Sequence, residues 1–248
     1  MIPARLGATR LPRKPLRLLA GSPLVIRVWQ RVTALDLADR CVIATDHADV
    51  AAAAKAAGAE CVMTRADHPS GTDRVAEVAA RAEYAGYDVV VNIQGDEPFV
   101  PSDAVRGAAG MVTGGKFELG TASAPATREA LLTPHVVKVV CADDGRALYF
   151  SRAAVPFLRD DADVGERDQW VRQHIGVYAY TKRALARWVS LPPHALERIE
   201  RLEQLRPLAA GMPMGVAAVD EILEGGIDTE DDLRRANERW RDLIAERV

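Results

Sequence analysis

The stretch DVVVNIQGDEP, residues 88–98, decides the fold class of this 248-residue chain. Five apolar or β-tolerant positions run from Val89 to Ile93 and end abruptly in a Gly-Asp-Glu-Pro turn. Such a run, bounded by turn residues, is typical of a buried strand that leads directly into a loop. Open α/β folds bind their ligands at the carboxyl edge of the sheet. We therefore expect Asp96 and Glu97 to lie where a ligand binds.

Short β-branched runs alternate with longer helical patterns around this strand. Apolar residues at helical spacing predict an amphipathic helix over roughly 23–35. Strands are predicted at 40–46 and around 60–63, separated by an alanine-rich helix that ends before Gly58. This alternation indicates βαβ units around a parallel sheet. After Lys116 the strand-like runs follow one another more directly, which favours an antiparallel, hairpin-like portion.

These patterns predict one α/β domain over residues 1–248, a three-layer nucleotide-binding (Rossmann-like) fold. Its central sheet is expected to be mostly parallel, with a smaller, more antiparallel inserted portion. The nucleotide-binding part would span roughly 1–115 and the inserted part roughly 116–215. A C-terminal helix is expected over roughly 229–245, because Thr229 and the acids after it form a typical helix start.

Composition excludes several classes of protein. The 32 Lys and Arg against 35 Asp and Glu give a net charge of −3, which argues against a nucleic-acid partner. The sequence shows neither an apolar run of ~20 residues nor a signal-peptide pattern, so we expect no membrane partner and a cytoplasmic location. Cys41, Cys61 and Cys141 stand singly, which favours buried reduced thiols over a metal or redox site.

Four cations lie on one constrained loop near the N-terminus. The segment IPARLGATRLPRKPL, residues 2–16, contains Arg5, Arg10, Arg13 and Lys14 among three prolines and a glycine. These charges repel one another unless an anion binds, and a triphosphate suits guanidinium forks, an ammonium and backbone N–H groups. The alternative is a solvated basic turn. The segment matches neither the P-loop pattern nor GxGxxG.

The carboxylates after the central strand suggest a metal site. Asp96 and Glu97 are costly to hold together unless a cation lies between them and the substrate, and Mg²⁺ needs only one or two protein carboxylates. Asp228, just before the last helix, is either a helix cap or a second ligand, and spacing alone favours the cap. The segment 68–74 is read either as a capped helix start or as a site for anions and base edges.

Polar residues of the second half form a further candidate group. His174 and Tyr178 are four residues apart on a predicted strand, so they share a face and can point into one pocket. A structural role for His174 is the alternative. Glu200 and Glu203, expected on one helix, can equally form a solvated helical face.

Nine motifs occur in an order that resembles one family closely: PARLGATRLPRKPL, ATD, MTRADHPSGTDR, VNIQGDEP, VKVV, ALYFSRA, HIGVYAY, LEQLR and GIDT. The chain resembles the CMP-KDO synthetases (3-deoxy-manno-octulosonate cytidylyltransferases), whose first motif is usually PARxxSTRLPGKPL. Here Ala8 replaces the usual serine and Arg13 the usual glycine, so the loop loses a hydroxyl and gains a cation. The family has several strand residues before Pro-Ala-Arg, so the strand at Met-Ile-Pro is very short or the sequence begins late.

The resemblance implies a Mg²⁺-dependent, cytoplasmic and homodimeric enzyme of lipopolysaccharide biosynthesis. It would form CMP-KDO and pyrophosphate from CTP and KDO, by in-line attack of the anomeric hydroxyl on the α-phosphate. The alternatives are a cytidylyltransferase for another acid (sialic-type, amino-KDO or phosphonic), a UTP-dependent transferase for a sugar phosphate, and a non-catalytic CTP sensor.

The resemblance also implies site residues. The catalytic ones are Arg5, Arg10, Lys14 and Asp96, and the metal ligands are Asp96 and Asp228. The CTP-binding residues are Pro3, Ala4, Arg5, Lys14, Ala44, Thr45, Asp46, Arg65, Ser70, Gly71, Thr72, Gln94 and Gly95. The sugar-acid site in the part over 116–215, which would also form the dimer interface, contains Arg152, His174, Tyr178, Glu200, Glu203 and Gln204.

Overall fold

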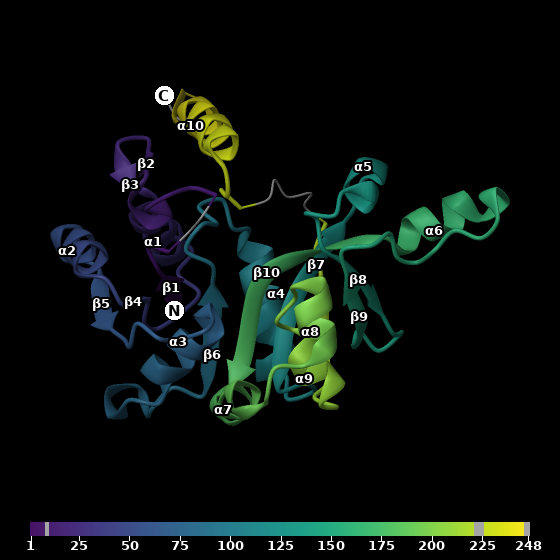
Figure 1. The fold of residues 1–248 in the computed structure, drawn as a ribbon, viewed down its shortest axis with the longest axis horizontal. Coiled ribbons are helices and arrows are strands. Elements are labelled where there is room, and N and C mark those ends of the chain that lie inside the picture. The colour runs from purple at the N-terminus through teal and green to yellow at the C-terminus, as the bar shows by residue number, and fades with distance from the viewer. Residues whose placement is uncertain (8–9, 221–225, 246–248) are drawn as a thin grey trace. The chain divides into compact units, whose positions relative to one another are not determined.

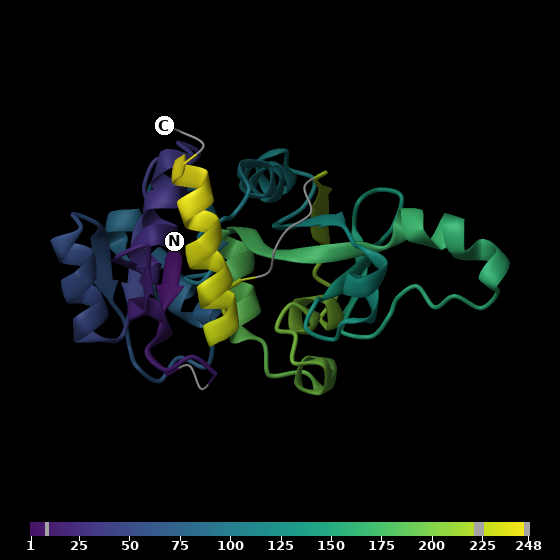
Figure 2. The same cartoon turned by 90° about the horizontal axis from the view of Figure 1, so that it is seen from above.

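The computed structural model describes residues 1–7, 10–220 and 226–245, and it has the expected α/β fold (Figures 1 and 2). The chain divides into two compact units. The first comprises Met1–Ala85, Asn92–Val100 and Gly225–Val248, and the second Gly86–Val91 and Pro101–Glu224. Helix α4 (Ser102–Thr113) thus belongs to the second unit, although the sequence patterns grouped it with residues 1–115.

The first unit contains a parallel sheet of three strands in the order β1-β4-β5. They are β1 (Ile2–Ala4), β4 (Val42–Thr45) and β5 (Glu60–Met63). β1 is only three residues long and entirely buried, and the end of β6 (Val89–Ile93) lies against it, because the Ile93 N–H donates to the Met1 carbonyl at 3.1 Å.

The helices of the first unit follow the predicted pattern. They are α1 (Leu24–Ala34), α2 (Ala48–Ala56) and α3 (Gly71–Ala79), with short 3-10 turns η1 (Lys14–Leu16) and η2 (Ala82–Tyr84). Helices α1 and α3 pack on β1, and α2 packs on β5 and β4. A two-stranded hairpin, β2 (Leu18–Leu19) and β3 (Ser22–Pro23), joins the N-terminal loop to α1.

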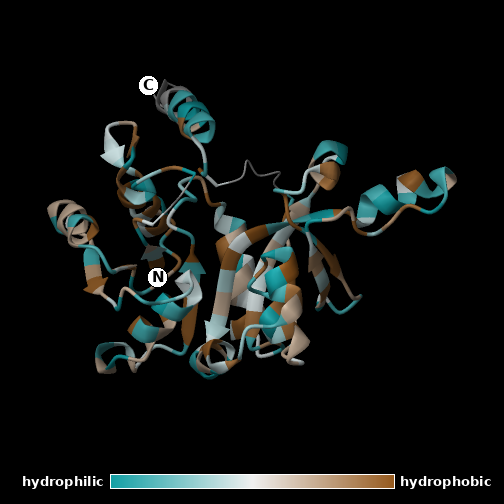
Figure 3. Ribbon diagram, viewed as in Figure 1, coloured by the Kyte–Doolittle hydropathy of each residue, from teal (hydrophilic) through white to brown (hydrophobic). Residues whose placement is uncertain are grey.

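Helix α10 (Glu230–Ala245) completes the core of the first unit. Leu233 and Ala236 are buried in one cluster with the N-terminal residues Leu11, Leu19 and Leu24. The helix is mostly hydrophilic elsewhere, as Figure 3 shows, so it buries a single apolar stripe. Polar contacts reinforce this packing: the Asn237 side chain accepts the Ala20 N–H at 2.8 Å, and Arg17 pairs with Glu230.

The second unit contains a sheet in the order β11-β7-β10-β8-β9, with β6 also paired to β10. Its strands are β7 (Leu119–Pro125), β8 (Lys138–Cys141), β9 (Ala147–Ser151), β10 (Arg172–Thr181) and β11 (Met214–Ala218). β11 is parallel to β7, whereas the β7–β10, β10–β8 and β8–β9 pairs are antiparallel. The predicted antiparallel portion is thus confirmed.

The described part of the second unit also contains seven helical segments. Besides α4 they are α5 (Arg128–Leu132), η3 (Asp161–Asp163), α6 (Val164–Trp170), α7 (Lys182–Ser190), α8 (Ala195–Glu200) and α9 (Leu205–Ala209). Helix α4 packs on β7, β10 and β11, and α7 packs on β10. Across the described parts of the chain, no helix combines the length and apolar character needed to cross a membrane.

The expectation of one helix carrying Glu200, Glu203 and Gln204 is wrong. Helix α8 ends at Glu200, and Arg201 adopts a left-handed conformation with φ 54°. Glu203 and Gln204 lie in the turn before α9. Pro207 explains the restart: it has no N–H to donate to residue 203, so it is tolerated only in the first turn of a new helix.

The three cysteines are free thiols and only partly buried. Burial raises the pKa of each thiol above its usual range. Among the described residues, no three His, Cys, Asp or Glu side chains gather around a common point that could hold a metal ion.

A glycine in β7 provides a test of the α4 packing. A Cβ at Gly120 would lie 2.2 Å from the Ala108 carbonyl oxygen of α4, whereas a Cβ at Gly110 in α4 would meet nothing within 4 Å. Gly120→Ala should therefore lower the free energy of unfolding by about 1–3 kcal/mol. Gly110→Ala should raise it by about 0.5–1 kcal/mol, because the unfolded chain loses freedom. Denaturant unfolding measures both, and equal effects would contradict this packing.

Candidate functional site

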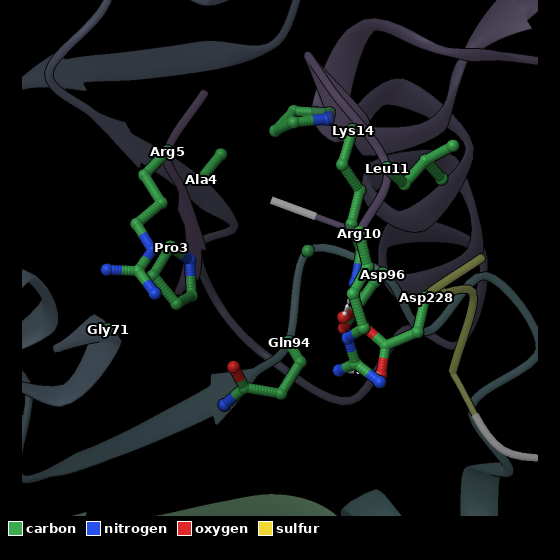
Figure 4. A pocket seen from close by; sticks show the side chains of 12 residues that line it. Pro3, Ala4, Arg5, Arg10, Leu11, Lys14, Gly71, Gln94, Asp96 and Asp228 are labelled. Carbon is green, nitrogen blue, oxygen red and sulfur yellow. Dashed lines mark hydrogen bonds and ion pairs between the residues drawn. The ribbon is translucent and has the colours of Figure 1, made fainter. Parts of the chain in front are cut away.

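A pocket of about 330 Å³ in the first unit brings together residues from distant parts of the sequence. It is lined by Pro3, Ala4, Arg5, Arg10, Leu11, Lys14, Pro15, Gly71, Gln94, Gly95, Asp96 and Asp228. Figure 4 shows the Lys14, Arg10, Asp96 and Asp228 side chains gathered together, with Arg5 and Pro3 apart from them. All four predicted catalytic residues and both predicted metal ligands thus line one pocket.

Lys14 holds two carboxylates together in this pocket. Its ammonium donates to Asp228 Oδ1 at 2.7 Å and to Asp96 Oδ2, while Arg10 donates to Asp228 Oδ2 at 2.7 Å. Burial opposes the charge of Lys14, but the two carboxylates outweigh it and raise the pKa of this lysine. Two carboxylates therefore converge on a single cation.

This arrangement fits a divalent ion of the magnesium type. Mg²⁺ keeps several waters and takes only one or two protein carboxylates, with phosphate oxygens as further ligands. Asp96 and Asp228 already share one cation, the Lys14 ammonium, which shows that both can face the same positive charge. Burial and the Asp96 charge raise the pKa of the neighbouring Glu97 above its usual range.

Arg13 does not add its charge to the pocket. It has φ 55° and ψ 32°, a left-handed conformation in which a side chain costs about 1–2 kcal/mol and glycine costs little. This geometry explains why a glycine suits the position in the resembled motif. The Arg13 guanidinium instead pairs with Asp49 Oδ2 of α2 at 2.6 Å, on the exposed surface. The cation that the sequence gains here is therefore used outside the pocket.

Two glycines allow the backbone segments of the pocket to approach closely. A Cβ at Gly95 would lie 2.8 Å from the Pro3 carbonyl oxygen, and one at Gly71 would lie 3.2 Å from Pro3 Cγ. The start of α3, the end of β6 and the end of β1 are thus in contact. Gly71 is the first residue of α3, where helix N–H groups have no acceptor within the helix itself.

Other predicted CTP-binding residues do not line this pocket. Ala44 and Thr45 are fully buried in β4, and Arg65 is exposed. Ser70 caps α3: its hydroxyl accepts the Asp73 N–H at 3.2 Å and donates to Asp73 Oδ2 at 2.6 Å. The capping alternative is therefore realised at Ser70. The residues in question are Ala44, Thr45, Asp46, Arg65, Ser70 and Thr72, and their roles stay predictions.

A polar cluster that no sequence motif indicated shapes the loop before α3. Glu77 accepts the Arg65 N–H at 3.0 Å and contacts His68 Nε2 at 2.5 Å. Despite the opposing effect of burial, these partners and Arg81 lower the pKa of Glu77 to about 2. Nearby, buried Arg74 pairs with Asp46 at 3.2 Å. The sequence does not reveal these pairs, because the partners lie on a loop whose path cannot be read from residue spacing.

In the second unit, the predicted sugar-acid residues form hydrogen bonds at the end of β9. Glu200 accepts from the Ser151 hydroxyl at 2.7 Å and from the Arg152 N–H at 2.9 Å. The Arg152 guanidinium donates to the carbonyls of Glu200, Pro134 and Arg201 at 2.7, 3.0 and 3.3 Å. The carboxylate of Glu200 therefore bonds protein groups and does not belong to a solvated helical face.

His174 and Tyr178 lie together on β10, as predicted. Their ring centroids are 5.3 Å apart, and the centroids of His174 and Phe150 are 5.0 Å apart in a T-shaped arrangement. Desolvation lowers the pKa of His174 to about 3, so its imidazole is neutral at physiological pH. Gln204 is buried, and Glu203 is partly buried.

Comparison with known proteins agrees with this arrangement. Residues 1–214 match the family model described as Cytidylyltransferase. The chain is 63% identical to a 3-deoxy-manno-octulosonate cytidylyltransferase of Gemmatimonas aurantiaca, over 99% of this chain and 95% of that protein. It is 44% identical to the protein of that name from Yersinia pseudotuberculosis, with 95% of both chains covered.

A solved structure is similar over the whole chain. It is that of CMP:2-keto-3-deoxy-manno-octonic acid synthetase complexed with CTP, with a TM-score of 0.86 and 33% sequence identity. The similarity covers 100% of this chain and 98% of that one.

The Glu77 cluster predicts a dependence of stability on acid pH. A carboxyl whose pKa is lowered by folding stabilises the protein above its unfolded pKa of 4.5, and this contribution is lost as the pH falls toward 2. Glu77→Gln should lower the free energy of unfolding at pH 7 by about 1–2 kcal/mol, allowing for solvent screening.

Thermal unfolding measured from pH 7 to pH 2 checks this prediction. The difference between the wild type and Glu77→Gln should shrink below pH 4.5. The exposed Glu83→Gln is the matched control and should unfold like the wild type. A constant difference at all pH values would mean that the Glu77 charge does not contribute.

Proposed function

Because the chain belongs to the cytidylyltransferase family, and within it to the 3-deoxy-manno-octulosonate cytidylyltransferases, we propose that it joins the CMP part of CTP to KDO. Pyrophosphate is the second product. The observation that carries this proposal is the pocket of the first unit, where Arg5, Arg10 and Lys14 lie with Asp96 and Asp228. Cations for a triphosphate and carboxylates for a metal ion occur there together.

The nucleotide would be held from several sides of this pocket. Arg5, Arg10 and Lys14 can neutralise the triphosphate, since guanidinium and ammonium groups form charge-assisted hydrogen bonds with phosphate oxygens. The N–H groups at the start of α3, beginning with Gly71, add neutral donors. The Gln94 amide both donates and accepts hydrogen bonds, so it can bond the edge of the cytosine base.

Asp96 and Asp228 would hold Mg²⁺. The ion, when bound, neutralises phosphate charge and lowers the pKa of the attacking hydroxyl. The Lys14 ammonium, which now bonds both carboxylates, would find other acceptors in the phosphate oxygens of CTP. Without a substrate, Lys14 and Arg10 together balance the two carboxylates, and the metal ion would do so once CTP is bound.

The sugar acid would bind residues of the second unit. Arg152 has five N–H donors and uses three of them on carbonyl oxygens, so two are left for the carboxylate of the acid. His174, Tyr178 and the Glu200, Glu203 and Gln204 segment would bind its hydroxyls. Positioning and charge neutralisation suffice for an in-line attack of the anomeric hydroxyl on the α-phosphorus, without a covalent enzyme intermediate.

Four further properties belong to this proposal: Mg²⁺ dependence, a homodimeric state, a cytoplasmic location and a role in lipopolysaccharide biosynthesis. Large apolar side chains of the second unit support the dimer. Phe157 is 84% exposed and Trp170 is 55% exposed, in a segment that joins β9 to β10. A second copy of the chain would cover them.

Removing either aspartate should disable the reaction. Asp96→Asn and Asp228→Asn should lower kcat by about two orders of magnitude or more, because the charge opposite the metal and the phosphates is lost. Pyrophosphate release with CTP, KDO and Mg²⁺ measures this effect. Asp231→Asn, at a side chain that is 75% exposed, is the control and should keep wild-type turnover. Near-normal activity of Asp96→Asn would exclude the metal assignment.

The acceptor is identified by a comparison of substrates. With CTP and Mg²⁺, KDO should give a kcat/KM at least about tenfold above that of sialic-type, amino-KDO or phosphonic acids. UTP should not replace CTP. Turnover of another acid without turnover of KDO would reassign the acceptor, and CTP binding without pyrophosphate release with any acid would exclude an enzyme.

A further inference from the structure

Thr121 connects His174 to an irregular part of strand β10. The β7–β10 pairing shifts register between Ile175 and Tyr178, where extra residues of β10 form a bulge. Thr121, on β7, is fully buried beside this bulge. Its hydroxyl oxygen lies 2.7 Å from the Val177 carbonyl oxygen, 3.3 Å from the Ile175 carbonyl oxygen and 2.9 Å from His174 Nε2.

The Thr121 hydroxyl has a single proton, so it can donate only one good hydrogen bond. Carbonyl oxygens have no proton to donate, so Thr121 must donate to the bulge, and the shorter contact is to Val177. If Nε2 of His174 had no proton, Thr121 would face acceptors on every side with one proton to share. Both short contacts are satisfied when Nε2 carries a proton and donates it to the Thr121 oxygen.

This arrangement selects one form of the imidazole. A neutral histidine with a proton on Nε2 has an unprotonated Nδ1, which accepts hydrogen bonds. The lowered pKa of His174 agrees with a neutral ring, and no described residue other than Thr121 hydrogen-bonds that ring. The Phe150 and Tyr178 rings further restrict its orientation.

We propose that Thr121 is a positioning residue, which fixes His174 as the Nε2–H tautomer so that Nδ1 can accept a hydrogen bond from a hydroxyl of the sugar acid. This inference rests on the proposed function, in which His174 binds the acceptor. It assigns a task to a buried hydroxyl that no sequence motif indicated. It also explains why a neutral imidazole suits the site: a substrate hydroxyl needs an acceptor, and the protonated ring has none.

The tautomer of the wild-type protein is the first test, and it needs no activity. ¹⁵N NMR of protein labelled at histidine distinguishes a protonated from an unprotonated ring nitrogen, and a His174→Gln sample assigns the signal. At pH 7, we expect Nε2 protonated and Nδ1 unprotonated. A proton on Nδ1 of His174 would overturn the proposal, whether or not the chain uses KDO.

Variants of Thr121 separate positioning from general stability. Thr121→Val removes the hydroxyl at similar size, so it should give mixed tautomers and raise the KM for KDO about tenfold, leaving the KM for CTP unchanged. Thr121→Ser keeps the hydroxyl and should restore both properties. Ser123→Ala removes another buried hydroxyl of β7, one that accepts from Arg172, and is the control for stability alone.

The outcomes distinguish the inference from the function on which it rests. A wild-type tautomer and an unchanged KM in Thr121→Val would contradict the positioning role. An equal rise of the KM for KDO in Ser123→Ala would show that lost stability explains the effect. If the wild type does not turn over KDO, the proposed function fails, and the NMR result still decides the role of Thr121.

Discussion

The ion pair network of Lys14 is the interaction on which the first unit depends most. Its ammonium bonds Asp96 and Asp228, so it ties the N-terminal loop to the end of β6 and to the segment before α10. Without a cation, these two carboxylates would repel each other in a partly buried place. In the proposed function, the Lys14 ammonium that holds these segments together would also bind the phosphates of a triphosphate, and the two carboxylates would bind its metal ion.

Much of this site could be predicted because it lies at the ends of regular elements. The run from Val89 to Ile93 reads as a buried strand, and an acid directly after it must lie at the carboxyl edge of the sheet. Asp228 could be read as a cap or a ligand from spacing alone, and resemblance decided for the ligand. In the structure its carboxylate contacts Arg10 and Lys14, while Asp232 accepts the N–H groups of residues 228 and 229.

Other features depend on contacts that a sequence does not show. The left-handed Arg201 separates α8 from α9, although the residues around it have continuous helical spacing. Thr121 and Glu77 have partners that are far along the chain or across a loop, and no motif links them. Arg13 is an added cation, as the sequence indicates, but only the structure shows that its guanidinium pairs with Asp49 outside the pocket. Ala8, which stands where the resembled motif has serine, lies outside the described residues.

The discontinuity of the first unit has a consequence for biosynthesis. Leu11, Leu19 and Leu24 are made early, yet they share a core with Leu233 and Ala236, which leave the ribosome more than 200 residues later. Until then, this apolar surface has no cover from α10, and Asp228 has not been made. Contacts of such large sequence separation form late, because the closure of a long loop precedes them. The nascent chain would therefore bury its second unit before its first is complete, and chaperones that bind exposed leucines would find their target in the N-terminal segment.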